Sequence, residues 1–176
     1  MDGLRFRRAT DLDIEDCIAI DAATDAQFVE AGHPELAGDG DYIPADVAHR
    51  AVADGRILVA DDDGDIVAWS FITRLDDELC LGQIAVLPSR QRSGVGSSLL
   101  QRILDDASAA GEPSIVLSTQ RDLAWNLPWY RRFGFTVVPE ANWSGEMASV
   151  AADQRADGLD WDGTRVYMRL VLGAVS

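Results

Sequence analysis

The sequence predicts an α/β (α+β) fold, in which helices flank a mixed, mostly antiparallel sheet of six to seven strands. Three observations predict it. Strand-like segments joined by turns precede a glycine-punctuated loop, an amphipathic helix follows the loop, and a mostly apolar strand of the kind found in buried parallel pairs follows the helix. No internal repeat or linker divides the 176 residues, so one domain spanning residues 1–176 is expected.

The N-terminal elements are a strand and a helix. Apolar and charged residues alternate from Leu4 to Arg8, which is typical of a strand. Thr10 or Asp11 can cap the helix that follows. The predicted apolar face of this helix keeps helical spacing and consists of Ile14, Cys17, Ile18 and Ala22.

An irregular segment and a second helix come next. Residues 28–35 are expected to be irregular, because Gly32 and Pro34 break regular structure on either side of His33. The second helix is expected from Pro44 to Asp54, with a glycine just past its end.

Three antiparallel strands lead up to the glycine loop. Segments 56–60 and 66–74 flank an acidic turn, residues 61–65, which we expect to be a hairpin loop longer than two residues. Asp76 and Asp77 then turn the chain into a strand from Glu78 to Leu87.

The glycine loop reads Gln-Arg-Ser-Gly-Val-Gly over residues 91–96, and a helix is expected to start near Ser97. Glycines let backbone approach a ligand, and the first N–H groups of a helix lack intrahelical partners, so the segment can bind a phosphate. Arg90 and Arg92 flank it in an otherwise acidic chain. A structural turn explains the loop as well, and its spacing is neither that of a P-loop nor that of a dinucleotide fingerprint, since position 99 is Leu.

Helices and strands alternate in the C-terminal half. The helix after the loop has a broad apolar face made by Val95, Leu99, Leu100, Ile103, Leu104 and Ala107. The elements expected after it are a strand at 114–119, a short helix at 126–133, a strand at 135–138, a helix at 147–157 and a strand at 164–172.

Composition excludes several classes of function. The net charge of −15 argues against non-specific nucleic-acid binding and against docking on anionic membranes, and it weakly favours a cationic partner. Cys17 and Cys80 stand among apolar residues and are expected to be small core residues, with no disulfide framework and no metal site. With no apolar signal region and no apolar run of the ~20 residues that a membrane span needs, a reduced, cytoplasmic protein is expected.

Two motifs together resemble one known family. Residues 91–96 match the Q/R-x-x-G-x-G/A signature of the GNAT superfamily of N-acetyltransferases, and residues 129–135, Trp-Tyr-Arg-Arg-Phe-Gly-Phe, look like its F/W-Y-x-x-x-G-F segment. Residues 85–88, Ala-Val-Leu-Pro, resemble the strand end that precedes the family's loop. The resemblance covers roughly residues 79–138 and implies a GNAT-like sheet with a splayed parallel pair of strands, 79–86 and 114–119.

The resemblance also implies a co-substrate, acetyl-CoA or another acyl-CoA, and no metal. The family's loop N–H groups hold the pyrophosphate, and the strand before the loop pairs with the pantetheine arm. The residues implied here are Ile84, Ala85, Val86, Gln91, Arg92, Ser93, Gly94, Val95, Gly96, Ser97 and Asn126. For Asn126, a helix cap is an alternative role.

Tyr130 is the catalytic candidate by its place in the second motif. Attack of an amine on a thioester expels a thiolate, and a phenol near the sulfur can give it a proton. A core tyrosine with its hydroxyl satisfied locally is the alternative.

No general base can be identified from the sequence. Where many family members keep a Glu on the strand before the loop, this chain has Gln83, an amide that cannot serve as a base. The candidates for the acceptor site are Glu30, His33, Glu35, Asp122 and Trp125. A solvated loop for the first three, a surface pair of Asp122 with Arg121, and a base acting through water all stay open.

The function expected is acetyl transfer from acetyl-CoA to a primary amine of a small molecule or peptide, by direct attack in a ternary complex. The alternatives are a CoA-binding sensor without turnover, and an acyltransferase that uses another acyl-CoA or a hydroxyl acceptor. A homodimer is possible, as is common in the family.

Overall fold

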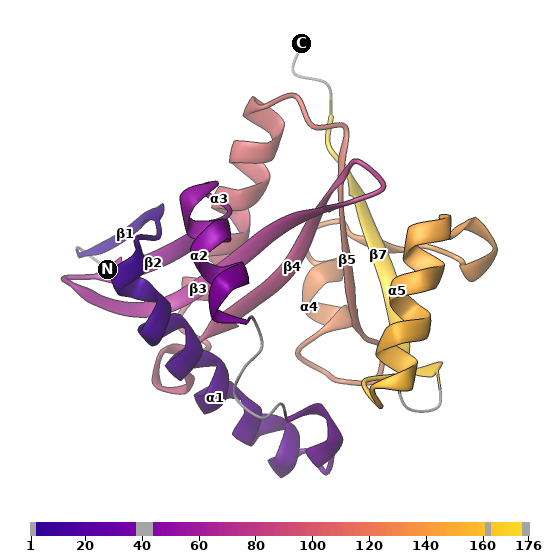
Figure 1. The fold of residues 1–176 in the computed structure, drawn as a ribbon, viewed down its shortest axis with the longest axis horizontal. Coiled ribbons are helices and arrows are strands. Elements are labelled where there is room, and N and C mark those ends of the chain that lie inside the picture. The colour runs from indigo at the N-terminus through magenta and orange to yellow at the C-terminus, as the bar shows by residue number, and fades with distance from the viewer. Residues whose placement is uncertain (1–2, 38–43, 161–162, 174–176) are drawn as a thin grey trace. The chain divides into compact units, whose positions relative to one another are not determined.

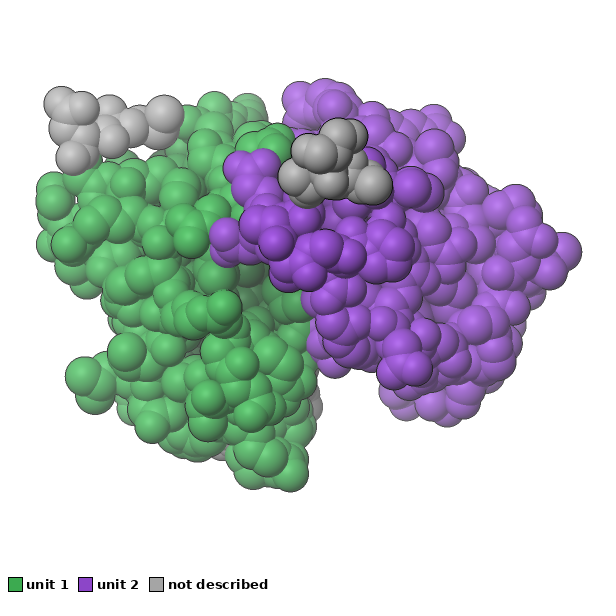
Figure 2. Space-filling model, turned by 90° about the horizontal axis from the view of Figure 1, so that it is seen from above, with its two compact units in different colours: residues 1–72, 83–103 green, residues 73–82, 104–176 purple. Residues whose placement is uncertain are grey.

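The computed structural model describes residues 3–37, 44–160 and 163–173. The chain divides into two compact units, coloured separately in Figure 2. Unit 1 comprises residues 1–72 and 83–103, and unit 2 comprises residues 73–82 and 104–176. The chain therefore passes between the units three times, and β4 contributes residues to both.

The strands form a seven-stranded sheet in the order β1-β2-β3-β4-β5-β7-β6. They are β1 (Leu4–Arg8), β2 (Ile57–Asp62), β3 (Asp65–Leu75), β4 (Glu78–Val86), β5 (Ser114–Gln120), β6 (Thr136–Val137) and β7 (Arg165–Val171). β4 and β5 run parallel, with Leu79–Leu81 paired to Ile115–Leu117, and the pairs β1–β2, β2–β3, β5–β7 and β6–β7 are antiparallel. The predicted mixed, mostly antiparallel sheet is confirmed.

The helices are mostly those that the sequence predicts (Figure 1). They are α1 (Ile14–Glu30), α2 (Ala45–Ala53), α3 (Val95–Ala109), α4 (Leu127–Arg131) and α5 (Gly145–Ala156), with short 3₁₀ turns at Asp11–Asp13, Pro34–Leu36, Pro88–Arg90 and Glu140–Asn142. α1 continues to Glu30, so residues 28–30 are helical rather than irregular, and α3 starts at Val95, two residues earlier than expected.

Each unit has its own apolar core. In unit 1, α1 and α2 pack on β2 and β3 through a cluster that includes Cys17, Ala51, Val59 and Trp69. In unit 2, α5 packs on β5 and β7 through Val116, Met147, Ala151 and Tyr167, with Cys80 of β4. The prediction that both cysteines are core residues is confirmed, and burial raises the pKa of each thiol to about 12.

The acidic hairpin between β2 and β3 is tighter than the sequence analysis predicts. Asp62 pairs with Asp65, so the loop has two residues, Asp63 and Gly64. Their φ angles of 54° and 102° are both positive, as the type I′ hairpin turn requires. The prediction of a longer loop is wrong. Asp63 and Gly64 alone adopt the two left-handed conformations that the turn requires, so Asp61 and Asp62 remain part of the strand.

The buried face of α1 is also different from the prediction. Ile14 and Cys17 are buried, but Ala22 is exposed, and the buried positions continue through Ile20, Asp21 and Asp25. Two carboxylates thus lie on the core side of this helix, where charged groups are rare unless they are paired or functional.

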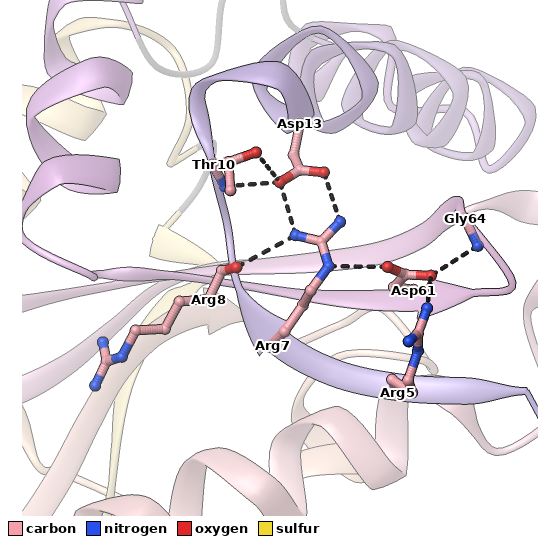
Figure 3. Close-up of polar contacts among 7 residues, drawn as sticks. All are labelled: Arg5, Arg7, Arg8, Thr10, Asp13, Asp61 and Gly64. Carbon is pink, nitrogen blue, oxygen red and sulfur yellow. Dashed lines mark hydrogen bonds and ion pairs between the residues drawn. The ribbon is translucent and has the colours of Figure 1, made fainter.

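Arg7 of β1 forms hydrogen bonds to the start of α1 and to the β2–β3 hairpin (Figure 3). Its guanidinium donates to both carboxylate oxygens of Asp13 at 2.8 Å and to Asp61 at 2.8 Å. Asp13 also accepts from the backbone N–H of Thr10 at 2.7 Å, and Thr10 is the N-cap of the 3₁₀ turn Asp11–Asp13. The N-cap of α1 itself is Asp13, so the prediction that Thr10 or Asp11 caps this helix is wrong; Asp11 pairs with His49. Bonding to Arg7 holds the pKa values of Asp13 and Asp61 below their usual range.

Replacing Arg7 with glutamine is expected to lower the melting temperature at pH 7 by about 5 °C, because two nearly buried carboxylates lose the Arg7 guanidinium and Asp61 keeps a longer pair with Arg5, at 3.6 Å. The lowered carboxyl pKa values mean that this stabilisation is present above the unfolded pKa and is lost as the pH falls below about 4. Thermal melts should therefore show a smaller deficit near pH 2 than at pH 7. The control is Arg50→Gln, which breaks an exposed pair with Asp46 and should shift the melting temperature by less than about 2 °C.

Candidate functional site

The end of β4 presents backbone groups on the edge that faces away from β3. The N–H of Leu87 donates to Val67 of β3 at 2.9 Å. Backbone groups alternate between the two edges of a strand, so Ala85 is directed to β3 like Leu87, while Ile84 and Val86 are directed to the opposite edge. The backbone groups of Ile84 and Val86 are thus the ones placed to pair with an added strand-like ligand.

Two glutamine side chains occupy this edge. Gln83 Oε1 accepts from the N–H of Ile84 at 3.2 Å, and Gln91 Nε2 donates to the carbonyl of Val86 at 3.1 Å. These amides satisfy backbone groups that would otherwise lack a partner. A pantetheine arm also carries amides, so the same edge can exchange one set of amide partners for another.

The glycine loop is held in a left-handed conformation at two positions. Arg92 has φ 57° and Gly94 has φ 92°. α3 then begins at Val95, and the carbonyl of Gly94 accepts its first helical bond from Ser98 at 2.9 Å. The N–H groups from Gly94 to Ser97 precede the first intrahelical donor, which is the geometry that binds anions in loops before helices.

The two arginines beside the loop differ. Arg90 pairs with Asp62 of the hairpin, so its charge is partly neutralised. Arg92 is exposed and stands at the left-handed position. Of the two, Arg92 offers the greater charge to a bound phosphate.

Tyr130 lies on α4 in unit 2 and is 8% exposed. Its ring contacts Trp129, with centroids 4.8 Å apart, and Phe135, at 5.7 Å, both edge-on. Burial raises the pKa of its hydroxyl, and the opposing effect of Arg165 is smaller. The phenol is therefore protonated at neutral pH, the form that a proton donor needs.

Asn126 directly precedes α4. Its carbonyl accepts from the N–H groups of Trp129 and Tyr130, but its side chain makes no capping hydrogen bond. The alternative role of Asn126, that its side-chain amide caps α4, is therefore not supported.

The acceptor-site candidates lie in two places. In unit 1, Glu30 is the exposed last residue of α1, His33 precedes the short 3₁₀ turn, and Glu35 lies within that turn, its side chain outside the described part of the chain. In unit 2, Asp122 and Trp125 are both exposed in the segment after β5. Asp122 accepts from Arg121 at 3.4 Å, so the surface pair considered as its alternative role is present.

The structure shows a buried carboxylate that the sequence analysis missed. Asp21 on α1 is 3% exposed, and its Oδ1 accepts from Trp69 Nε1 at 3.2 Å and from Gln83 Nε2 at 3.1 Å. Burial raises its pKa to about 7, although these two hydrogen bonds act in the opposite direction. The sequence contains a signal for this burial, because position 21 continues the helical spacing of Ile14, Cys17 and Ile18.

Replacing Asp21 with asparagine is expected to stabilise the protein at pH 8. A raised native pKa means that the wild-type protein loses stability as the pH rises from the unfolded value, 3.8, through the native value of about 7. The variant lacks this dependence, so its advantage should grow to about 2–4 kcal/mol between pH 4 and pH 8. Denaturant titrations across this range measure it, with Asp153→Asn on the exposed face of α5 as the control. A difference that does not change with pH would contradict the assignment.

Among the described residues, no helix is long and apolar enough to cross a membrane, and no three His, Cys, Asp or Glu side chains are grouped to hold a metal ion.

Comparisons with known proteins agree with this geometry. Residues 53–137 match the family model described as an acetyltransferase (GNAT) domain. A protein described as an IAA acetyltransferase from Azospirillum brasilense is 34% identical over 105 residues, which cover 54% of this chain and 68% of that protein.

Solved structures show the same fold at low identity. The PaiA N-acetyltransferase of Thermoplasma acidophilum, in complex with coenzyme A, superposes with a TM-score of 0.68 at 14% identity, over 96% of this chain and 98% of that one. The N-acetylglutamate synthase of Neisseria gonorrhoeae, complexed with coenzyme A and N-acetyl-glutamate, gives 0.67 at 18% identity, and the match covers 97% of this chain but 35% of that one. The solved structures show the fold, and the sequence match to the Azospirillum protein shows that the chain belongs to the GNAT acetyltransferases.

Proposed function

We propose that this protein transfers an acetyl group from acetyl-CoA to a primary amine. The observation that carries the proposal is the continuous segment 84–97, where the outward edge of β4 leads through a left-handed loop to the N-terminus of α3. The strand edge suits the amides of pantetheine, and the loop suits the pyrophosphate. The CoA-bound relatives of the same fold support this choice of donor.

The proposed reaction is a direct attack. The neutral amine nitrogen bonds to the thioester carbonyl carbon, and negative charge develops on the carbonyl oxygen, where a backbone N–H of β4 can stabilise it. The carbon–sulfur bond then breaks, and the thiolate of CoA takes a proton from Tyr130. The nitrogen loses one proton as the amide forms, and this proton restores the hydroxyl of Tyr130. Both thiols of the protein are buried with raised pKa values, which disfavours a covalent acetyl-cysteine intermediate.

Acceptor screening tests the proposal. Purified protein is incubated with acetyl-CoA and a panel of polyamines, amino acids, aminoglycosides and peptide N-termini, and released thiol and acetylated product are both measured. Turnover of an amine supports the proposal. Tight CoA binding without turnover of any acceptor would instead indicate a sensor, and turnover of hydroxyl compounds or only with longer acyl groups would change the substrate class.

A further inference from the structure

The interior of unit 1 contains a small polar cluster surrounded by apolar residues. Asp21 of α1, Trp69 of β3 and Gln83 of β4 meet at the single oxygen Oδ1 of the aspartate, with donor distances of 3.2 Å and 3.1 Å. A small, mostly apolar cavity of about 10 Å³ adjoins Asp21 and Trp69, and its other walls are Ile14, Cys17, Ile18, Ala48 and Ile57.

Among the described residues, no cation acts on the ionisation of Asp21. Both of its hydrogen-bond donors, an indole and an amide, are neutral. The titratable groups near it on its own helix are Asp25, which opposes its ionisation, and Cys17. The groups facing it from α2, β2, β3 and β4 are uncharged: Ala48, Ile57, Trp69 and Gln83.

Such an arrangement costs stability. A carboxylate taken out of water without a charged partner is less favourable than an apolar residue of similar volume at the same place. The two hydrogen bonds to Asp21 do not by themselves require a carboxylate, because an asparagine oxygen can accept the same two bonds. A carboxylate at this position therefore calls for a role that needs its ability to gain and lose a proton.

Gln83 connects this carboxylate to the proposed cofactor strand. Its Nε2 donates to Asp21, and its Oε1 accepts from the backbone N–H of Ile84. One side chain thus separates Asp21 from the edge of β4 on which we propose that the thioester lies. Gln83 also stands where the family resemblance implies a glutamate in many members. Asp21, hydrogen-bonded to Gln83, is therefore our candidate for the carboxylate that the strand lacks.

We propose that Asp21 is the proton acceptor for the attacking amine, an inference that rests on the proposed function. The ammonium group of the acceptor passes a proton, through water, to the Asp21 carboxylate. The neutral amine then forms its bond to the acetyl carbon, the carbon–sulfur bond breaks, and Tyr130 protonates the departing thiolate. The second proton, which the nitrogen loses as the amide forms, restores the hydroxyl of Tyr130. Asp21 afterwards returns its proton to solvent, so that charge and protons balance over the cycle.

The electrostatics of Asp21 suit this role. Burial raises its pKa to about 7, so the group is partly ionised at neutral pH and is a stronger base toward an ammonium than an ordinary carboxylate.

The test compares the pH dependence of kcat in three proteins, using an alkylamine that the wild-type protein acetylates. The wild-type kcat should rise with pH and level off above about 7. Asp21→Asn should lose this inflection and fall about 100-fold at pH 8. Gln83→Leu removes a hydrogen bond that lowers the pKa of Asp21, so its inflection should move to higher pH.

A second nucleophile separates proton transfer from structure. An arylamine that is already neutral at pH 7 needs no base, so Asp21→Asn should acetylate it at nearly the wild-type rate. A merely structural role would slow both nucleophiles equally.

The outcomes distinguish this inference from the proposed function. A wild-type protein that turns over no amine would overturn the proposed function, and the role of Asp21 with it. An active wild type together with an Asp21→Asn variant that keeps the wild-type kcat and inflection would overturn the role of Asp21 alone.

Discussion

Replacing Tyr130 with phenylalanine is expected to lower kcat by about 100-fold, while the dissociation constant for CoA changes by less than about twofold. The ring still fills its place against Trp129 and Phe135, so the variant should fold. What it loses is a hydroxyl that burial keeps protonated, the group that we propose gives a proton to the thiolate. Steady-state thiol release and calorimetric titration with CoA measure the two quantities.

Tyr167 supplies a matched control for this prediction. It is also a buried tyrosine of unit 2, with its pKa raised to about 12, and its hydroxyl donates to the carbonyl of Met147 at 3.1 Å. Tyr167→Phe should cost about 1 kcal/mol of stability through the lost hydrogen bond and leave kcat unchanged. If Tyr130→Phe behaves like Tyr167→Phe, Tyr130 has no part in the chemistry.

Replacing Gly94 with alanine is expected to weaken CoA binding at least about tenfold. Its φ of 92° is a conformation that alanine adopts only with strain of about 1 kcal/mol or more, so the loop relaxes and its N–H groups lose their common direction. No atom lies within 4 Å of an added Cβ, so the effect comes from backbone conformation rather than from a clash.

Gly64 provides the corresponding control. It has φ 102°, also with open space around an added Cβ, but it stands in the β2–β3 hairpin turn. Gly64→Ala should introduce a similar backbone strain without weakening CoA binding. Equal CoA affinities for the two variants would show that the left-handed conformation of the loop is not needed for CoA binding.

The sequence predicts the fold well because local patterns carry it. Apolar alternation and turn residues place the strands, and the order of the two motifs predicts the family that the comparisons show. The predicted element boundaries are wrong where the same residues are compatible with two local structures. The acidic run 61–65 resembles a loop, but its Asp-Gly pair makes a two-residue turn that lets the strands continue.

The candidate site is predicted less completely. The loop and Tyr130 belong to sequence motifs, so their positions follow from local spacing. Asp21 depends on contacts with Trp69 and Gln83, which are 48 and 62 residues away in the chain. Its burial therefore emerges only from the packing of α1 on the sheet, although its position on the apolar face of the helix was readable.

The most direct test of the account is calorimetric titration of the protein with acetyl-CoA and, in parallel, with acetyl-pantetheine, which lacks the pyrophosphate and the nucleotide. We propose that pantetheine lies on the edge of β4 and that the pyrophosphate binds the N–H groups of the loop. Acetyl-CoA should then bind saturably at micromolar concentration, and acetyl-pantetheine should bind at least about 100-fold more weakly. This difference corresponds to the ~3 kcal/mol that charge-assisted hydrogen bonds to the loop can supply. Equal affinities, or no binding of acetyl-CoA at millimolar concentration, would contradict it.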